Sequence, residues 1–214
     1  MGAPAVIFDM DGTILDSMGV WEKIDADFLA RRGLSVPAGY FDDVGHMCLR
    51  DAASYTIRRF SLPDSPDELV REWNDMACDE YAHNIPMKRG AREYLHRLEE
   101  NGAKMAIATS SPIGLCIPAL RNNGVEGFFD AVCTADEVGR GKESPDIFIL
   151  AAKKLMADPR DCIVFEDNLR AAQSARAAGM SVWGVYDDSA HRHWEEMKRF
   201  ADGWTIDFAN APIA

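Results

Sequence analysis

Two aspartates in close succession, Asp9 and Asp11, are followed by Gly12 and come directly after a short apolar segment, residues 5–8. An apolar run of this length and composition predicts a strand buried on both faces. Side chains alternate along a strand, so we expect both carboxylates to point the same way. At 4 Å and an effective dielectric near 20, two such charges repel by about 4 kcal/mol. We therefore expect a cation, a divalent metal ion, between them.

Further polar side chains come after other apolar segments. One apolar segment, residues 104–108, is followed by Thr109 and Ser110. Another, residues 162–167, ends with Glu166 and Asp167. Lys142 lies on a predicted loop after the third strand. In open α/β sheets ligands bind outside the carboxyl ends of the strands, where helix starts favour anions and lysine pairs with phosphate oxygens. This set of residue types is suited to phosphoryl transfer, which requires positioning and charge neutralisation.

The elements that must position these residues alternate along the chain. From residue 87 onward, apolar segments predicted as strands are separated by amphipathic segments predicted as helices. The first of these strands is expected within residues 104–111, where it runs into a polar turn, and the others at residues 131–134, 162–167, 181–186 and 204–206. The helix after the first of these is expected to start at Pro112 with Ser111 as its cap. Such alternation favours an α/β fold, a Rossmann-like parallel sheet with helices on both faces.

Residues 18–85 differ in character, since they read as helices without strands. The clearest helix start has Ser65 as N-cap, Pro66 at the first position and Glu68 completing a capping box. We interpret this block as an inserted α-helical cap domain. The predicted domains are a core of residues 1–17 and 86–214 and a cap of residues 18–85.

Composition narrows the class of protein. The chain has 214 residues, 47% hydrophobic and 27% charged, as in ordinary globular proteins. A net charge of −12 argues against a nucleic-acid partner, but not against a phosphorylated substrate, because charges beyond about 8 Å are screened. No signal peptide is visible, and no apolar run approaches the ~20 residues of a membrane span. With five cysteines and no C-x-x-C pair, we expect reduced thiols, a cytoplasmic location and no membrane partner.

Four segments resemble the motifs of the haloacid dehalogenase-like hydrolase superfamily, in the right order. They are FDMDGT (8–13), ATSS (108–111), GKESPDIF (141–148) and VFEDNLRAAQSARAAGM (164–180). The resemblance is greatest to the helical-cap branch that includes β-phosphoglucomutase and sugar-phosphate phosphatases. One departure is Asn168, where serine is often found.

The resemblance implies a role for each matching residue. Asp9 would be the nucleophile that forms an aspartyl-phosphate, and Asp11 the general acid and base. Mg²⁺ would be held by Asp9, Asp167 and the backbone carbonyl of Asp11, with Glu166 in support. The phosphate would be bound by the remaining motif residues, Gly12, Thr109, Ser110 and Lys142.

The expected function is a Mg²⁺-dependent phosphatase acting on a small phosphorylated metabolite. A β-phosphoglucomutase-like phosphotransferase is the alternative, although Trp21 stands where such mutases carry a cap histidine. Asp11 argues against a haloacid dehalogenase proper, and Lys23 has nothing to mark it as the Schiff-base lysine of a phosphonate hydrolase. A non-catalytic binding module is the other class, against which the retained motif residues argue. In the cap, His46 and Arg50 are candidate substrate contacts.

Overall fold

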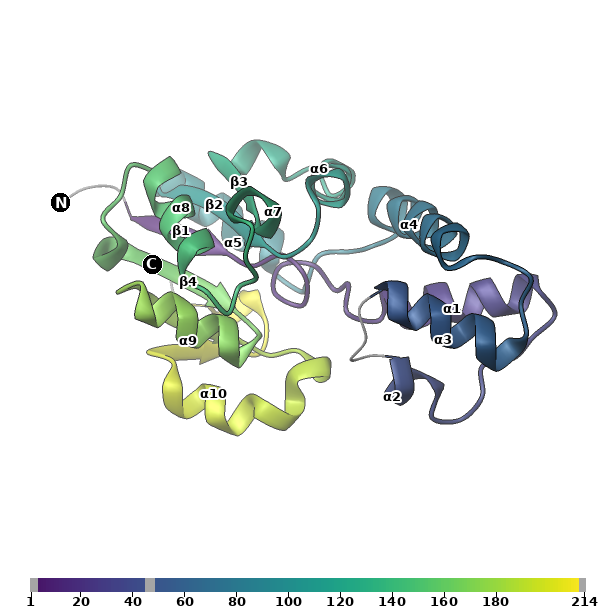
Figure 1. Cartoon of the computed structure of the whole chain (residues 1–214). Helices are drawn as coiled ribbons and strands as arrows, with labels where there is room; N and C mark the ends of the chain where they lie inside the picture. The colour runs from purple at the N-terminus through teal and green to yellow at the C-terminus, as the bar shows by residue number, and fades with distance from the viewer. Residues whose placement is uncertain (1–3, 45–48, 212–214) are drawn as a thin grey trace. The chain divides into compact units, whose positions relative to one another are not determined.

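The computed structural model of the chain describes residues 4–44 and 49–211, which divide into two compact units. One unit combines Met1–Met18 with Ile85–Ala214 and holds every strand of the described residues. The other, Gly19–Asn84, is helical (Figure 1). We refer to them as the core unit and the helical unit. That the helical unit acts as a cap remains a prediction.

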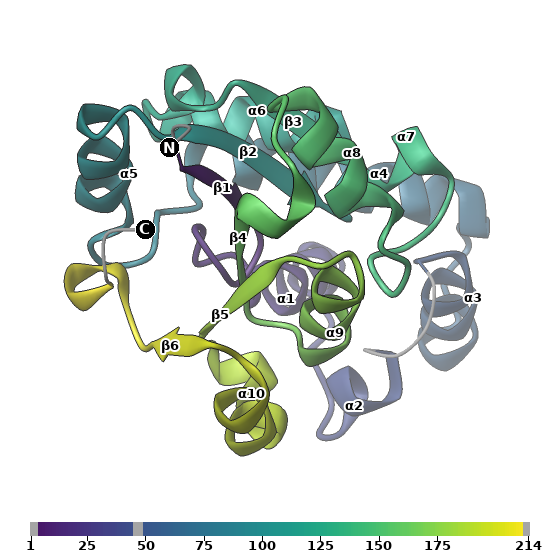
Figure 2. The same ribbon diagram turned by 90° about the vertical axis from the view of Figure 1, so that its left-hand side faces the viewer.

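The strands of the core unit form one parallel sheet, which confirms the predicted fold class (Figure 2). The strand order is β3-β2-β1-β4-β5-β6. In sequence order the strands are β1 Ala5–Phe8, β2 Lys104–Thr109, β3 Ala131–Thr134, β4 Cys162–Glu166, β5 Ser181–Val185 and β6 Gly203–Thr205. The order reverses between β1 and β4, and such a switch point opens a crevice at the carboxyl ends of the strands.

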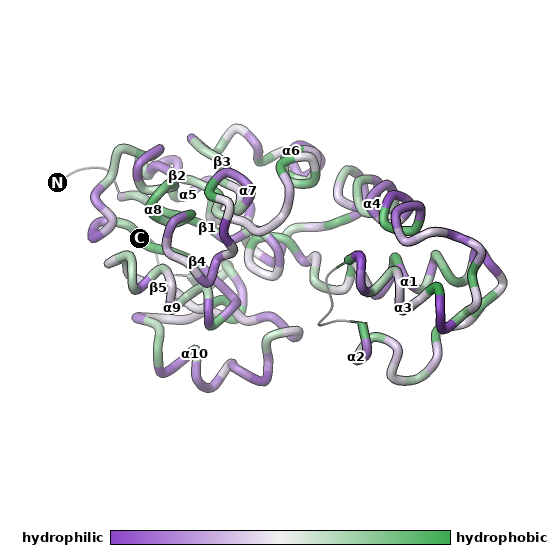
Figure 3. The backbone as a smooth tube through the Cα atoms, viewed as in Figure 1, coloured by the Kyte–Doolittle hydropathy of each residue, from purple (hydrophilic) through white to green (hydrophobic). Residues whose placement is uncertain are grey.

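Both faces of the sheet are buried under helices. One face packs on α8 (Asp146–Lys154), α9 (Leu169–Ala177) and α10 (Trp194–Phe200) through a largely aliphatic cluster that includes Ile7 and Val164. On the other face Phe8 stacks on Phe165 with ring centroids 5.1 Å apart. Tyr94 of α5 (Ala91–Glu100) packs edge-on against both rings. The central strands are accordingly apolar along most of their length (Figure 3).

The helical unit contains α1 (Val20–Arg31), α2 (Tyr40–Val44), α3 (Leu49–Phe60) and α4 (Pro66–His83), and α4 packs against both α1 and α3. The predicted capping box at the start of α4 is confirmed. Ser65 Oγ accepts from the Glu68 amide at 3.3 Å, and the Glu68 carboxylate accepts from the Ser65 amide at 2.8 Å. The core of the unit includes Phe28 against Trp73, with ring centroids 5.7 Å apart.

Some local predictions were wrong. The helix after β2, α6 (Ile113–Asn122), starts one residue later than predicted, with Pro112 rather than Ser111 at its N-cap. The reason is that the Ser111 amide and hydroxyl are both bonded elsewhere, to Thr109 and Asp11. Strand β6 begins one residue earlier than predicted, and the short helices α2 and α7 (Ala135–Val138) were not predicted, because one turn carries too little periodicity.

Two features bear on the chain's environment. No helix in the described ranges is long and apolar enough to cross a membrane. Cys78, Cys116, Cys133 and Cys162 carry free thiols, and Cys48 lies outside the described residues.

Candidate active site

Asp9 lies where the two central strands β1 and β4 end. Its amide donates to the carbonyl of Phe165 at 2.9 Å, which continues the β1–β4 ladder one residue beyond Phe8. The side chain is buried, and its Oδ1 is 2.6 Å from Nζ of Lys142. Lys142 is buried as well, in the segment between α7 and α8. The nucleophile candidate therefore has its cation partner already in place.

Two further carboxylates, from the end of β4, join Asp9. One oxygen each from Asp9, Glu166 and Asp167 lies within 4.8 Å of the others, and all three residues are buried. Lys142 contacts this cluster twice, since its Nζ is also 2.5 Å from Glu166 Oε2. Adjacent parallel strands end at the same edge of the sheet, which is why residues more than 150 positions apart in the chain meet here.

The charges of the cluster do not balance, because three carboxylates face one ammonium. Burial alone would lower the pKa of Lys142, but the charges of Asp9 and Glu166 outweigh it and raise that pKa. Burial raises the pKa of Glu166, and the Asp9 charge adds to the effect. The pKa of Asp167 is raised by burial, then by Asp9 and Glu166. A divalent cation would relieve this repulsion, and hard carboxylate oxygens are the donors that Mg²⁺ and Ca²⁺ prefer.

The turn after β1 is built around Asp167. Gly12 has φ +81°, and a Cβ there would lie 2.8 Å from Asp167 Oδ2 and 3.0 Å from Cγ of Met18. Thr13, fully buried, donates its hydroxyl to Asp167 Oδ1 at 3.1 Å. Only glycine meets both the conformation and the close approach. The residues present thus fit a metal site: oxygen donors only, converging, buried and in excess of their positive partner.

Asp11 is placed differently from the expectation. Its two carboxylate oxygens accept hydrogen bonds from Ser17 Oγ and Ser111 Oγ, both at 2.7 Å. Among the described residues, the carboxylates gathered with Asp9 are those of Glu166 and Asp167, not that of Asp11. That Asp9 and Asp11 share a cation stays a prediction. Because β1 ends at Phe8 and the chain turns at once, strand alternation does not extend to residue 11.

The segment after β2 lies beside Asp11. Thr109 is buried, and its Oγ1 is 3.5 Å from Asp11 Oδ2 and accepts from the Ser111 amide at 3.0 Å. Ser110, between them, is exposed. The structure thus brings Thr109 to Asp11 and Lys142 to Asp9, while the roles of these residues and of Ser110 in binding phosphate stay predictions.

Several residues of this site were not predicted as such. Three hydroxyl side chains each donate a hydrogen bond to a predicted site residue: those of Thr13, Ser17 and Ser111. In the sequence, only their position within or beside two of the motifs could have indicated this. Asn168 was noted only as a departure from serine. Its side chain caps α9 by accepting from the amides of Arg170 and Ala171, and its own amide donates to Glu166 Oε1 at 3.1 Å.

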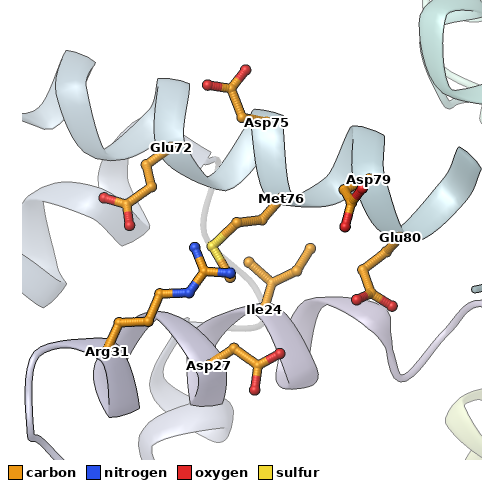
Figure 4. A pocket seen from close by; sticks show the side chains of 8 residues that line it. All are labelled: Ile24, Asp27, Arg31, Glu72, Asp75, Met76, Asp79 and Glu80. Carbon is orange, nitrogen blue, oxygen red and sulfur yellow. The ribbon is translucent and has the colours of Figure 1, made fainter. Parts of the chain in front are cut away.

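The candidates in the helical unit are less informative. His46 lies outside the described residues. Arg50 forms an ion pair with Asp67 at 2.6 Å, and both side chains are about two-thirds exposed. Lys23 pairs with Glu80 and Asp27. A surface pocket between α1 and α4 is lined by residues of this unit alone (Figure 4): Ile24, Asp27, Arg31, Glu72, Asp75, Met76, Asp79 and Glu80.

Comparison with known proteins places this geometry in context. Residues 6–185 match the model of a family described as haloacid dehalogenase-like hydrolase. Fructose-1-phosphate phosphatase YqaB of Escherichia coli is 31% identical over 84% of this chain and 95% of its own length. The phosphorylated carbohydrates phosphatase of Thermotoga maritima is 27% identical, over 85% and 84%. The chain spans about half the length of another relative, the bifunctional riboflavin kinase/FMN phosphatase of Arabidopsis thaliana, at 30% identity over 84% of this chain.

Solved structures agree on the fold. A candidate beta-phosphoglucomutase from Thermotoga maritima superposes with a TM-score of 0.83 at 24% identity, covering 94% of each chain. CbbY from Rhodobacter sphaeroides, solved with phosphate, has a TM-score of 0.77 at 21% identity and covers 98% of this chain and 96% of its own.

Proposed function

This chain belongs to the haloacid dehalogenase-like hydrolase family, and on that premise we propose that it is a Mg²⁺-dependent phosphatase. Its substrate class would be small phosphorylated metabolites, and within them phosphorylated sugars or sugar alcohols. The names of its relatives support this class: phosphorylated carbohydrates phosphatase, fructose-1-phosphate phosphatase and hexitol phosphatase B. The proposal includes a cytoplasmic location, which the free thiols of Cys116, Cys133 and Cys162 support.

The observation that carries the proposal is the convergence of Asp9, Lys142, Glu166 and Asp167 at the ends of β1 and β4. Buried like charges are retained where they have a ligand to bind. In the first step a carboxylate oxygen of Asp9 attacks phosphorus, and the ester P–O bond breaks. Asp11 gives a proton to the departing alkoxide. The product is an aspartyl-phosphate on Asp9 and a free alcohol.

The second step restores the enzyme. Asp11, now a carboxylate, takes a proton from water as the water oxygen attacks phosphorus. The bond between phosphorus and Asp9 breaks, which releases inorganic phosphate and returns both aspartates to their starting states. Throughout, the ammonium of Lys142, 2.6 Å from Asp9 Oδ1, offers positive charge to the phosphoryl oxygens. The buried hydroxyl of Thr109 would donate a hydrogen bond to them.

Asp9, Glu166 and Asp167 would hold Mg²⁺. When bound, the ion supplies positive charge that neutralises the phosphoryl group. The backbone carbonyl of Asp11 remains a proposed further ligand. Glu166 would also orient Lys142, which it contacts at 2.5 Å.

The test is phosphate release from p-nitrophenyl phosphate, with Mg²⁺ and then with excess EDTA, followed by a panel of phosphorylated sugars, sugar alcohols and nucleotides. We expect turnover that EDTA abolishes and Mg²⁺ restores, with preference for a sugar or sugar-alcohol phosphate. No turnover of any ester would favour the non-catalytic binding module.

The mutase alternative is favoured by one observation, the TM-score of 0.83 with the candidate beta-phosphoglucomutase. It is separated from the phosphatase by incubation with glucose 1-phosphate and a sugar bisphosphate activator. We expect free glucose and phosphate. Isomerised glucose 6-phosphate would instead establish the mutase.

A further inference from the structure

We propose that Ser111 is a positioning residue that sets two groups of the site at once, the proton donor Asp11 and the hydroxyl of Thr109. This inference rests on the proposed phosphatase function and deepens it. Neither the match to the family nor the similarity to named phosphatases assigns a role to this serine, which the sequence pattern marked only as a helix cap.

The first contact is with Asp11. Ser111 Oγ donates to Asp11 Oδ2 at 2.7 Å, and Ser17 Oγ donates to Asp11 Oδ1 at the same distance. The two serines come from segments 94 positions apart in the chain and take opposite oxygens of one carboxylate. Charge-assisted hydrogen bonds of this length are strong and directional. Together they fix the plane of the carboxylate, and Ser111 ties it to the segment after β2.

The second contact is with Thr109. The backbone N–H of Ser111 donates to Thr109 Oγ1 at 3.0 Å. A hydroxyl oxygen that accepts from an amide must direct its own hydrogen elsewhere. In the structure the Thr109 hydroxyl donates to Asp11 Oδ2 at 3.5 Å, the limit of a hydrogen bond. A bond this long is weak, so a bound phosphoryl oxygen can take over the Thr109 hydrogen.

Ser111 itself is held by the start of α6. Pro112 restricts the backbone of the preceding residue to extended conformations, so Ser111 cannot join the helix. The carbonyl of Ser111 accepts from Cys116 Sγ at 3.4 Å, and the carbonyl of Pro112 accepts from the Cys116 amide at 3.2 Å. Cys116 is buried in α6. The serine is therefore anchored to a helix, and its two donors are aimed at two functional groups.

The proposal predicts how activity depends on the leaving group. Protonation by Asp11 matters most when the departing alkoxide is a strong base, and little when it is p-nitrophenolate. In Ser111→Ala, kcat/KM for alkyl and sugar phosphates should fall at least tenfold more than kcat/KM for p-nitrophenyl phosphate. A merely structural serine would lower both by the same factor, because loss of folded enzyme does not depend on the substrate.

The experiment is a plot of log kcat/KM against leaving-group pKa for a series of aryl and alkyl phosphates, with Mg²⁺. Val and Thr have the same shape, so Ser111→Val and Ser111→Thr should disturb packing equally, but only Thr keeps the hydroxyl. Far-UV circular dichroism checks that each variant is folded. In Ser111→Val and Ser111→Ala we expect log kcat/KM to fall more steeply with leaving-group pKa than in wild type, and in Ser111→Thr to fall as in wild type. Ser174→Ala, a buried serine of α9, is the control and should keep the wild-type slope.

The outcomes are distinguishable. Equal losses along the series, or wild-type values for Ser111→Ala and Ser111→Val, would overturn the role of Ser111 while leaving the phosphatase proposal intact. A wild-type protein without turnover of any ester would overturn both.

Discussion

The core unit and the helical unit treat acidic side chains in opposite ways. In the core unit three buried carboxylates, those of Asp9, Glu166 and Asp167, share a single lysine. Several acids of the helical unit instead lie in partly exposed ion pairs, such as Asp27 with Lys23 and Asp67 with Arg50. Arg32, for example, makes two hydrogen bonds to Glu72 at 2.7 and 3.0 Å while its guanidinium lies 3.8 Å from the centre of the Phe28 ring.

The buried carboxylates of the core unit are suited to binding a ligand, whereas exposed ion pairs in the helical unit contribute to stability and solubility. Exposed ion pairs stabilise a fold by ~1 kcal/mol or less, and their loss is tolerated. Buried like charges oppose folding unless something binds to them. Among the described residues of the helical unit, Asp25 of α1 is a buried carboxyl. Burial raises its pKa to about 7, although a hydrogen bond from Tyr40 lowers it in part. Asp25 therefore tests whether buried charge alone marks function.

The largest effect is expected from Asp9→Asn. The amide cannot attack phosphorus, so kcat should fall by at least about 10³-fold, as when a nucleophile is removed elsewhere. Asn keeps the shape of the side chain, and Lys142 retains Glu166 as a partner, so the fold should persist. Steady-state assays with p-nitrophenyl phosphate and far-UV circular dichroism measure both. Activity within tenfold of wild type would remove Asp9 from the role of nucleophile.

The second largest effect is expected from Lys142→Met, which removes the ammonium group that faces the buried carboxylates of the core unit. Breaking a buried pair by removing one partner typically costs about 3–5 kcal/mol. We expect a loss of this size in the free energy of unfolding from urea titrations at pH 8, partly recovered by Mg²⁺. The matched control is Lys154→Met, which removes a partly exposed partner of Glu137 and should cost less than about 1 kcal/mol. Equal losses for both lysines would mean that the cluster is not strained.

Most of this arrangement was predictable from the sequence, for a physical reason. Buried parallel strands are continuous apolar runs, and polar residues at their carboxyl ends must meet at one edge, so Asp9, Thr109 and Asp167 could be placed together before the structure was known. What could not be predicted depends on turns. Asp11 lies beyond the strand, where side-chain direction is set by hydrogen bonds to Ser17 and Ser111 rather than by alternation.

The helical unit was predictable in its helices but not in its buried polar groups. Helical periodicity and the capping box at Ser65 identify α4, but periodicity counts Asp25 as a polar position and does not reveal that it is buried. Its partners come from tertiary packing. Tyr40 of α2, which bonds Asp25, also bonds Thr56 of α3 at 2.8 Å. Such contacts between helices leave no local signal.

The third prediction concerns Asp25→Asn and pH. The pKa of Asp25 is about 7 in the folded protein and lower in the unfolded chain. Between about pH 4 and pH 7 the carboxyl is therefore protonated in the folded state and ionised in the unfolded state, so the free energy of unfolding falls as the pH rises. The stabilisation by this group is complete below about pH 4 and is lost as the pH rises to about 7. Asn imitates the neutral carboxyl, so the variant should match wild type near pH 4 and exceed its stability by about 2–4 kcal/mol at pH 8.

The measurement is the difference between the two urea-unfolding curves at several pH values, which cancels the contribution of other groups. Asp27→Asn, on the same helix with a half-exposed side chain, is the control and should change the free energy of unfolding by less than about 1 kcal/mol. A difference for Asp25→Asn that does not change with pH would show that Asp25 is ionised and compensated in the folded state. Phosphatase activity should be retained in both variants, because burial without convergent partners does not make a site.

The smallest effect is expected from Arg50→Ala. The Arg50–Asp67 pair is about two-thirds exposed on both sides, so its loss should change the free energy of unfolding by less than about 0.5 kcal/mol. Arg32→Ala is the contrasting variant, since it removes two ion pairs and a ring contact, and should cost more. Because folding depends so little on Arg50, its substitution isolates the proposed contact with substrate. We expect KM for the preferred sugar phosphate to rise about threefold or more with kcat unchanged, the signature of lost uniform binding. An unchanged KM would leave Arg50 with one role, that of an exposed ion-pair partner of Asp67.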